Sequence, residues 1–136
     1  MKRIGITIAA TVALAGAMFV AEATAHKAKF DTAVSAKYNK PDKKDPYAVA
    51  NFDGALSSSK ARCEKNRTVT LYKREANGTS TVVGSDVTDL TGAWAVQPSS
   101  VAPGTYYAQT AKKVLRKNRK HRHVCKAGVS RDISVK

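Results

Sequence analysis

From residue 48 to the C-terminus, apolar and polar residues alternate in short runs, and this pattern limits the folds open to the chain. The side chains of a strand point alternately to its two faces, so alternation is typical of strands with one buried face. The runs lie at residues 52–56, 68–72, 93–97, 106–110, 125–129 and 133–135. No apolar stripe with helical spacing runs through this region. Trp94 and Tyr106 are expected to fill the core between the sheets.

Turn signals separate these runs. Asn77-Gly78 is a strong hairpin signal after the run at residues 68–74. The segments 89–92 (Asp-Leu-Thr-Gly) and 103–104 (Pro-Gly) have the composition of two further turns. We count about seven strands, and their spacing predicts an all-β, antiparallel sandwich or barrel.

Four short motifs follow one another in this part of the chain. They are Phe52-Asp53-Gly54, Val69-Thr70-Leu71-Tyr72, Thr88-Asp89-Leu90-Thr91-Gly92-Ala93-Trp94 and Pro103-Gly104-Thr105-Tyr106-Tyr107-Ala108. Their order resembles the prealbumin-like or carboxypeptidase-regulatory-like modules of secreted bacterial proteins. In those modules, a Thr-Asp-x-x-Gly-x-aromatic turn precedes one strand, and a Pro-Gly-x-Tyr turn leads into the next. The resemblance covers residues 48–136 and implies a single Ig-like β-sandwich of about seven strands. Because such modules are usually non-catalytic, it implies no catalytic residues.

The N-terminus has the three parts of an export signal. Residues 1–3 are positive at Lys2 and Arg3, residues 4–21 carry no charge, and small residues stand at Ala23 and Ala25. We expect cleavage after Ala25, or after Ala23, and a mature protein that is secreted outside the cell or into the cell envelope. An uncleaved membrane anchor is the alternative, but Ala, Gly and Thr dilute the apolar run. We identify no second run long enough to cross a membrane.

Residues 26–47 have the composition of a tail. They are rich in Lys and Asp, contain Pro41 and Pro46, and have few apolar residues. Such a composition is typical of a mobile or loosely attached segment. The predicted organisation is therefore a signal peptide at residues 1–25, a flexible basic segment at 26–47 and a β-sandwich domain at 48–136.

The two cysteines of the chain are Cys63 and Cys125. Two cysteines in an exported chain favour a disulfide bond. This bond would close most of the domain into one loop. It would also bring together the residues that flank the two cysteines.

Many of those flanking residues are basic. The chain has 24 Lys and Arg against 10 Asp and Glu, a net charge of +14, and clustered cations attract polyanions without reading a sequence. We predict a polyanion-binding patch at one end of the sandwich, with an ordinary solvated loop as the alternative. The predicted patch consists of Lys112, Lys113, Arg116, Lys117, Arg119, Lys120, Arg122 and Lys126 near Cys125, and of Lys60, Arg62, Lys65 and Arg67 near Cys63.

The expected partners are polyanions of the envelope or the extracellular space, namely teichoic acid, lipopolysaccharide or anionic polysaccharide, or else nucleic acid bound through its charge. Sequence-specific nucleic-acid binding is not expected, because no aromatic residue for base stacking lies between Lys112 and Lys126. A second hypothesis is a structural or surface-assembly subunit that contacts a protein partner, with a charge that serves only solubility.

Copper or zinc binding is a third hypothesis. On a strand, His121, His123 and Cys125 would share one face, and cleavage after Ala25 would leave His26 at the N-terminus. Two arguments oppose it: Cys125 is assigned to the disulfide, and the histidines stand among cations that repel a metal ion. The prediction therefore includes no metal site and no cofactor.

Enzyme chemistry has little support in the sequence. Gly-x-Ser-x-Gly, His-Glu-x-x-His and phosphate-loop motifs are absent. Carboxylates are sparse, so no general acid–base pair is evident. We assign no catalytic residue and expect a non-catalytic protein.

Overall fold

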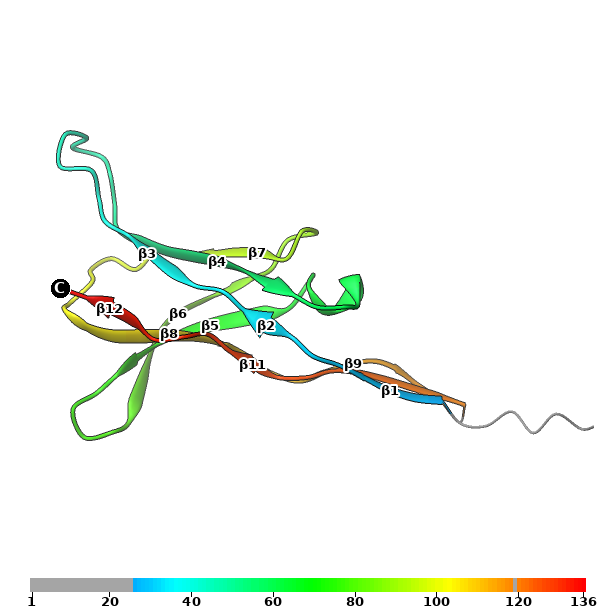
Figure 1. Ribbon diagram of the computed structural model, residues 1–136. Coiled ribbons are helices and arrows are strands. Elements are labelled where there is room, and N and C mark those ends of the chain that lie inside the picture. Colours follow the sequence, from blue (N-terminus) through cyan, green and yellow to red (C-terminus); the bar gives the residue numbers. More distant parts are fainter. Residues whose placement is uncertain (1–25, 119) are drawn as a thin grey trace, which may run out of the picture.

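A computed structural model describes residues 26–118 and 120–136, so the predicted leader and Arg119 lie outside the described residues. The described chain consists of strands and one short 3-10 helix, η1 (Ala61–Cys63) (Figure 1). The strands are β1 (His26–Phe30), β2 (Ala33–Val34), β3 (Lys37–Asn39), β4 (Asn51–Ser57), β5 (Thr68–Arg74), β6 (Ser80–Val87), β7 (Ala93–Val96), β8 (Gly104–Thr110), β9 (Lys113–Lys117), β10 (His121–Cys125), β11 (Gly128–Val129) and β12 (Ile133–Val135). Within these ranges, no helix has the length and apolar character needed to span a membrane.

Strand β4 is the centre of the first sheet. β2 and β3 pair one after the other with one edge of β4, and β7 pairs antiparallel with the other edge. Phe52 and Leu56 share a parity on β4 and are buried, as strand alternation requires. Gly54 lies between them, against the carbonyl group of Ser35, where a side chain would not fit.

The second sheet has the order β11-β8-β5-β6, with β12 also paired to β8. All of its pairings are antiparallel. The predicted hairpin at Asn77-Gly78 is confirmed: it joins β5 to β6, and Gly78 has a φ of +85°, a conformation that glycine adopts without strain.

The hydrophobic core lies between these two sheets, which form the predicted β-sandwich. Trp94 and Tyr106 are 3% and 2% exposed, which confirms their assignment to the core. The Tyr106 hydroxyl donates a hydrogen bond to the Ala102 carbonyl oxygen (2.6 Å), so the polar end of this ring has a partner. The other core residues are Phe52, Leu56, Val69, Leu71, Val96, Ala108 and Val135.

The described chain has twelve strands where about seven were expected. Several are successive pieces of one interrupted strand: β2 and β3 both pair with β4, and β11 and β12 both pair with β8. If β1–β3, β8–β9 and β10–β12 are each counted as one interrupted path, seven paths remain.

The turn at residues 89–92 is also confirmed. The Asp89 carboxylate accepts hydrogen bonds from the Thr91 hydroxyl (2.7 Å), the Thr91 N–H (2.8 Å) and the Ala93 N–H (3.0 Å). These bonds, with that of the Thr91 hydroxyl foremost, lower the pKa of Asp89 below its ordinary value. Gly92 follows with a φ of +86°.

A third sheet, β1-β10-β9, projects from one end of the sandwich (Figure 1). β9 and β10 form an antiparallel hairpin, whereas β1 runs parallel to β10. The structure corrects the predicted flexible segment at residues 26–47, because residues 26–39 contain β1, β2 and β3. The composition of these strands resembles that of a tail because most of their side chains are exposed or half-buried. Their backbones nevertheless pair with β10 and β4.

Candidate functional site

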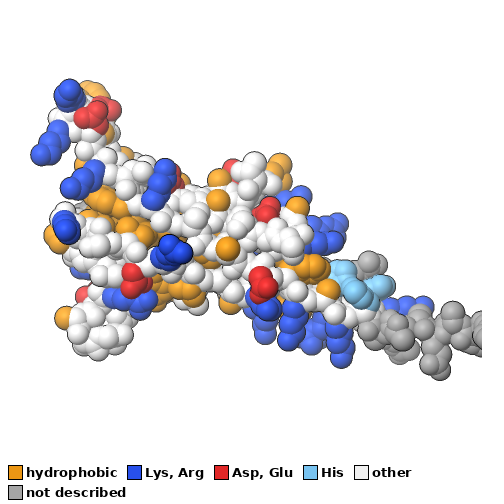
Figure 2. Space-filling view, in the orientation of Figure 1, with side chains coloured by type: hydrophobic (Ala, Val, Ile, Leu, Met, Phe, Trp, Pro, Cys, Tyr) orange, Lys and Arg blue, Asp and Glu red, His pale blue; other side chains and the backbone are white. Residues whose placement is uncertain are grey.

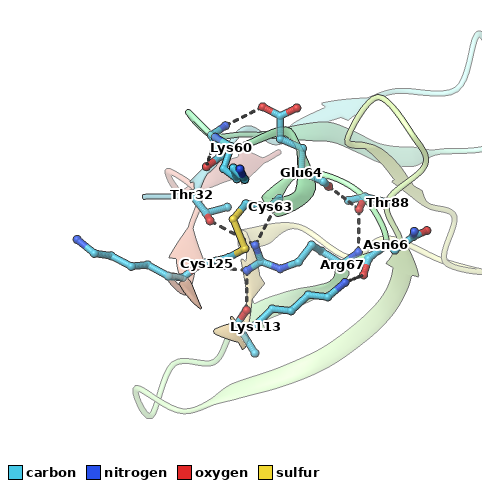
Figure 3. Close-up of a disulfide and its surroundings, with 12 residues drawn as sticks. Thr32, Lys60, Cys63, Glu64, Asn66, Arg67, Thr88, Lys113 and Cys125 are labelled. Atoms are coloured by element: carbon cyan, nitrogen blue, oxygen red, sulfur yellow. Dashed lines mark hydrogen bonds between the residues drawn. A yellow bond between two sulfur atoms is a disulfide. The ribbon is translucent and has the colours of Figure 1, made fainter. Parts of the chain in front are cut away.

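The predicted disulfide between Cys63 and Cys125 is confirmed (Figure 3). It joins η1 to the C-terminal end of β10, across 62 positions of sequence, with a Cα–Cα distance of 5.4 Å. Both cysteines are fully buried. The bond therefore fastens the three-stranded sheet to a loop at the end of the sandwich.

Arg67, which was predicted to belong to the basic patch, is only 2% exposed. Its guanidinium group donates hydrogen bonds to the carbonyl oxygens of Ala111 (2.6 Å), Cys63 (2.7 Å) and Lys126 (3.1 Å), and to the Thr32 hydroxyl (3.3 Å) (Figure 3). Burial lowers the pKa of Arg67 from its ordinary value. The structure thus corrects this assignment: the donors of Arg67 connect η1 to the segments that follow β8 and β10.

Strands β1 and β10 present two faces of different chemistry. In their parallel register, His26 pairs with His121, and Lys27 pairs with Arg122. Because alternate side chains of a strand point to opposite faces, the three histidines fall on one face and the cations of these two strands on the other. The histidine face consists of His26, Ala28, Phe30, His121, His123 and Cys125, and the cationic face of Lys27, Lys29, Arg122 and Val124.

A surface pocket of about 220 Å³ is lined by all four residues of the cationic face, together with Ala28 and Lys112. We call it the basic pocket; it is lined by Lys27, Ala28, Lys29, Lys112, Arg122 and Val124. In the described part of the chain, no Asp or Glu contributes to this lining, so no carboxylate neutralises the pocket from within. Figure 2 shows Lys and Arg side chains gathered beside the histidines at this end of the molecule.

The basic pocket contains part of the predicted patch. Lys112 and Arg122 belong to its lining, and Lys117 pairs with Arg122 across β9 and β10. Lys126 instead forms an ion pair with Asp31, with an Nζ–Oδ1 distance of 2.7 Å. This contact compensates part of the charge of Lys126, which makes it a weaker candidate for binding an external anion.

Other members of the predicted patch do not line the basic pocket. Lys60 lies over the ring of Phe30, 5.8 Å from its centre, and therefore beside the histidine face. Lys113 donates a hydrogen bond to the Asn66 carbonyl oxygen (2.8 Å). Arg62 is exposed in η1, Lys65 lies just after η1, and Lys120 is exposed between β9 and β10. The side chain of Arg116 and all of Arg119 lie outside the described residues.

Lys27 and Lys29 belong to the pocket but were not included in the predicted patch. A signal for them is present in the sequence, because these two cations alternate with His26, Ala28 and Phe30. Such alternation indicates a strand with a cationic face. It was hidden by the Lys- and Asp-rich composition of the residues that follow.

The structure places His121, His123 and Cys125 on one face of β10, as their spacing predicts, and Cys125 is in the disulfide. As the side chains stand, no three His, Cys, Asp or Glu residues within 26–118 and 120–136 are arranged to hold a metal ion. No family model, curated protein or solved structure matches the chain.

Proposed function

We propose that this protein binds polyanions through the basic pocket. The observation that carries the proposal is the convergence of four cations on one cavity that no described carboxylate lines. Lys27 and Lys29 come from β1, Arg122 from β10, and Lys112 from the link between β8 and β9. These segments are distant in sequence, so it is the pairing of β1 with β10 that supports a concentrated rather than a diffuse positive charge.

The chemistry of the lining favours ligands that carry sulfate, phosphate or carboxylate groups. The Arg122 guanidinium can bind two oxygens of one such group at once, whereas each Lys ammonium acts as a compact charge. The Val124 side chain is buried in the lining and adds an apolar surface. Three of the four cations stand on strands, so the backbone of the site is held in place before a ligand binds.

The charge of the whole chain supports a polymeric ligand. The whole chain carries a net charge of +14, of which +13 remains without Lys2, Arg3 and Glu22 of the leader. Such an excess attracts polyanions over long distances, and binding releases the counterions of the polymer. Lys117, opposite Arg122 in the β9–β10 register, lies next to the pocket along the sheet and extends the row of cations. Teichoic acid, lipopolysaccharide and anionic polysaccharides have repeating charges that suit such a row.

Three further properties belong to this proposal. The protein is exported with removal of residues 1–25, which the leader pattern and the disulfide support. It is a prealbumin-like, Ig-like module, and the motifs at residues 88–94 and 103–108 support this part of the proposal. It binds without catalysis, in keeping with two cysteines that are both used in a disulfide and with sparse carboxylates.

Chromatography on immobilised heparin, used as a sulfated polyanion, tests the proposal. A pocket variant carries Lys27→Gln, Lys29→Gln, Lys112→Gln and Arg122→Gln. A control variant loses the same charge at exposed positions outside the pocket, through Lys40→Gln, Lys43→Gln, Lys44→Gln and Lys136→Gln. We expect the pocket variant to elute at clearly lower salt than the parent protein and the control to elute close to the parent.

Equal shifts of the two variants would overturn the proposal, because retention would then follow total charge rather than the pocket. Unchanged elution of the pocket variant would overturn it as well. If the protein is not retained on heparin at all and co-purifies with a stoichiometric protein partner, the surface-assembly hypothesis takes its place.

A further inference from the structure

The three histidines of the chain meet at one place. The sequence contains only His26, His121 and His123. The His26 ring centre lies 5.4 Å from that of His123 and 6.2 Å from that of His121, and the centres of His121 and His123 are 6.1 Å apart. The parallel pairing of β1 with β10 produces this triangle, because it sets His26 opposite His121 at the start of both strands.

These separations are close to those of imidazoles that share a metal ion. With metal–nitrogen distances of about 2.0–2.1 Å, two coordinating imidazoles have ring centres roughly 5–6 Å apart. The rings now stand edge to face, with interplanar angles of 63°, 80° and 81°. Rotations of the side chains would therefore have to turn the ring nitrogens toward a common point. His26 is exposed and His121 is half-buried, which leaves these two rings room to turn.

Two of the basic neighbours of the triangle point away from it. Lys27 and Arg122 lie on the cationic face. Lys60 remains on the histidine side, over the ring of Phe30, and Arg116 pairs with His123 in the β9–β10 register. Phe30 closes one side, with its ring centre 5.9 Å from that of His123. Cys125 is in the disulfide and so cannot compete as a ligand or reduce a bound copper ion.

A fourth nitrogen lies next to the triangle. The backbone nitrogen of His26 donates to the Lys120 carbonyl oxygen (2.6 Å), at the end of the turn that leads into His121. If the leader is removed after Ala25, this nitrogen becomes an α-amino group on the same residue as one of the three imidazoles. An amine and an imidazole of one residue can then bind one ion together.

We propose that His26, His121 and His123 form a binding site for a divalent transition-metal ion. A set of nitrogen ligands follows the usual order of divalent affinities, in which Cu²⁺ exceeds Zn²⁺. The site binds Cu²⁺ more tightly than Zn²⁺, and removal of the leader after Ala25 strengthens it. Because this site and the basic pocket lie on opposite faces of the sheet, the proposal does not depend on polyanion binding.

Titration with Cu²⁺ and with Zn²⁺ tests the site on the processed protein that begins at His26. We expect one Cu²⁺ per chain by calorimetry, and nitrogen hyperfine splitting in the electron paramagnetic resonance spectrum. The variants His26→Ala, His121→Ala and His123→Gln should each weaken Cu²⁺ binding by roughly tenfold or more, since each removes a ligand. A version that retains Ala25 should bind Cu²⁺ more weakly than the processed protein.

The matched control is Lys27→Ala with Arg122→Ala, which removes the neighbouring side chains on the opposite face. This control should bind Cu²⁺ at least as tightly as the parent protein. Far-ultraviolet circular dichroism checks that each variant is folded, and His121→Ala, at a half-buried position, keeps the test valid if His123→Gln unfolds. Cu²⁺ binding that is unchanged in His121→Ala would overturn the proposal, because His121 would then not be a ligand of the ion. Absence of Cu²⁺ binding to the processed protein would overturn it too.

Discussion

Replacing both cysteines tests how much of the stability depends on the link between η1 and β10. The variant is Cys63→Ala with Cys125→Ala. The bond closes a loop across 62 positions. The chain-entropy relation then gives a loss of about 4 kcal/mol in the free energy of unfolding, because the unfolded chain regains the conformations that the loop excluded. A domain of this size is stable by about 5–15 kcal/mol in total, so the variant should remain folded only narrowly.

The single tryptophan provides the assay. Trp94 is 3% exposed in the core of the sandwich, and no other tryptophan contributes to the fluorescence. Urea unfolding followed at this residue reports the free energy of the sandwich in the parent protein and the variant. The parent protein treated with a reducing agent should match the variant, which separates the loss of the bond from the loss of two side chains. A loss of less than about 1 kcal/mol would refute the reasoning, because the entropy of a loop this long would then not limit the unfolded state.

Two more predictions use the same fluorescence assay. Arg67→Met should lower the free energy of unfolding by about 3 kcal/mol. Met fills the space, but the carbonyl oxygens of Cys63, Ala111 and Lys126 lose their donor. A loss below about 1 kcal/mol would contradict the linking role of Arg67. Asp89→Asn should flatten the decline of stability in acid. Because the folded-state pKa of Asp89 is lowered, its carboxylate stabilises the fold above the unfolded pKa, and this contribution is lost as the pH falls through the folded pKa. Urea midpoints measured from about pH 6 to about pH 2.5 should therefore change less in the variant than in the parent, and parallel curves would contradict this.

The sandwich was predictable where local chemistry decides the structure. Asn77-Gly78 favours a hairpin, and Asp89 caps its own turn, so both turns follow from residues a few positions apart. Trp94 and Tyr106 are large and share the parity of their apolar neighbours, which places them in the core. The disulfide followed from the count of two cysteines and the expected export.

The third sheet was not predictable in the same way. β1 alternates cations with His26, Ala28 and Phe30, but none of its side chains is buried, so its signal is weaker than that of the core strands. Its place is set by its pairing with β10, a strand about ninety-five positions away. The burial of Arg67 differs from the prediction because its parity, and not its charge, decides where its side chain lies. It has the same parity as Val69 and Leu71, both fully buried, and alternation therefore points it inward.

The attachment of the three-stranded sheet bears on both proposed sites. Its described residues contribute nothing to the core cluster of the sandwich. Its attachments include the disulfide, the hydrogen bonds that Arg67 donates to the segments beside it, and the hydrogen bond from Lys113 to the Asn66 carbonyl oxygen. The cationic face and the histidine face are two sides of this same sheet, so a ligand can occupy one face without covering the other. Both faces depend on the register of β1 against β10. A shift of one residue would place lysines of β1 on the same face as the histidines of β10, and both the basic pocket and the histidine triangle would be lost.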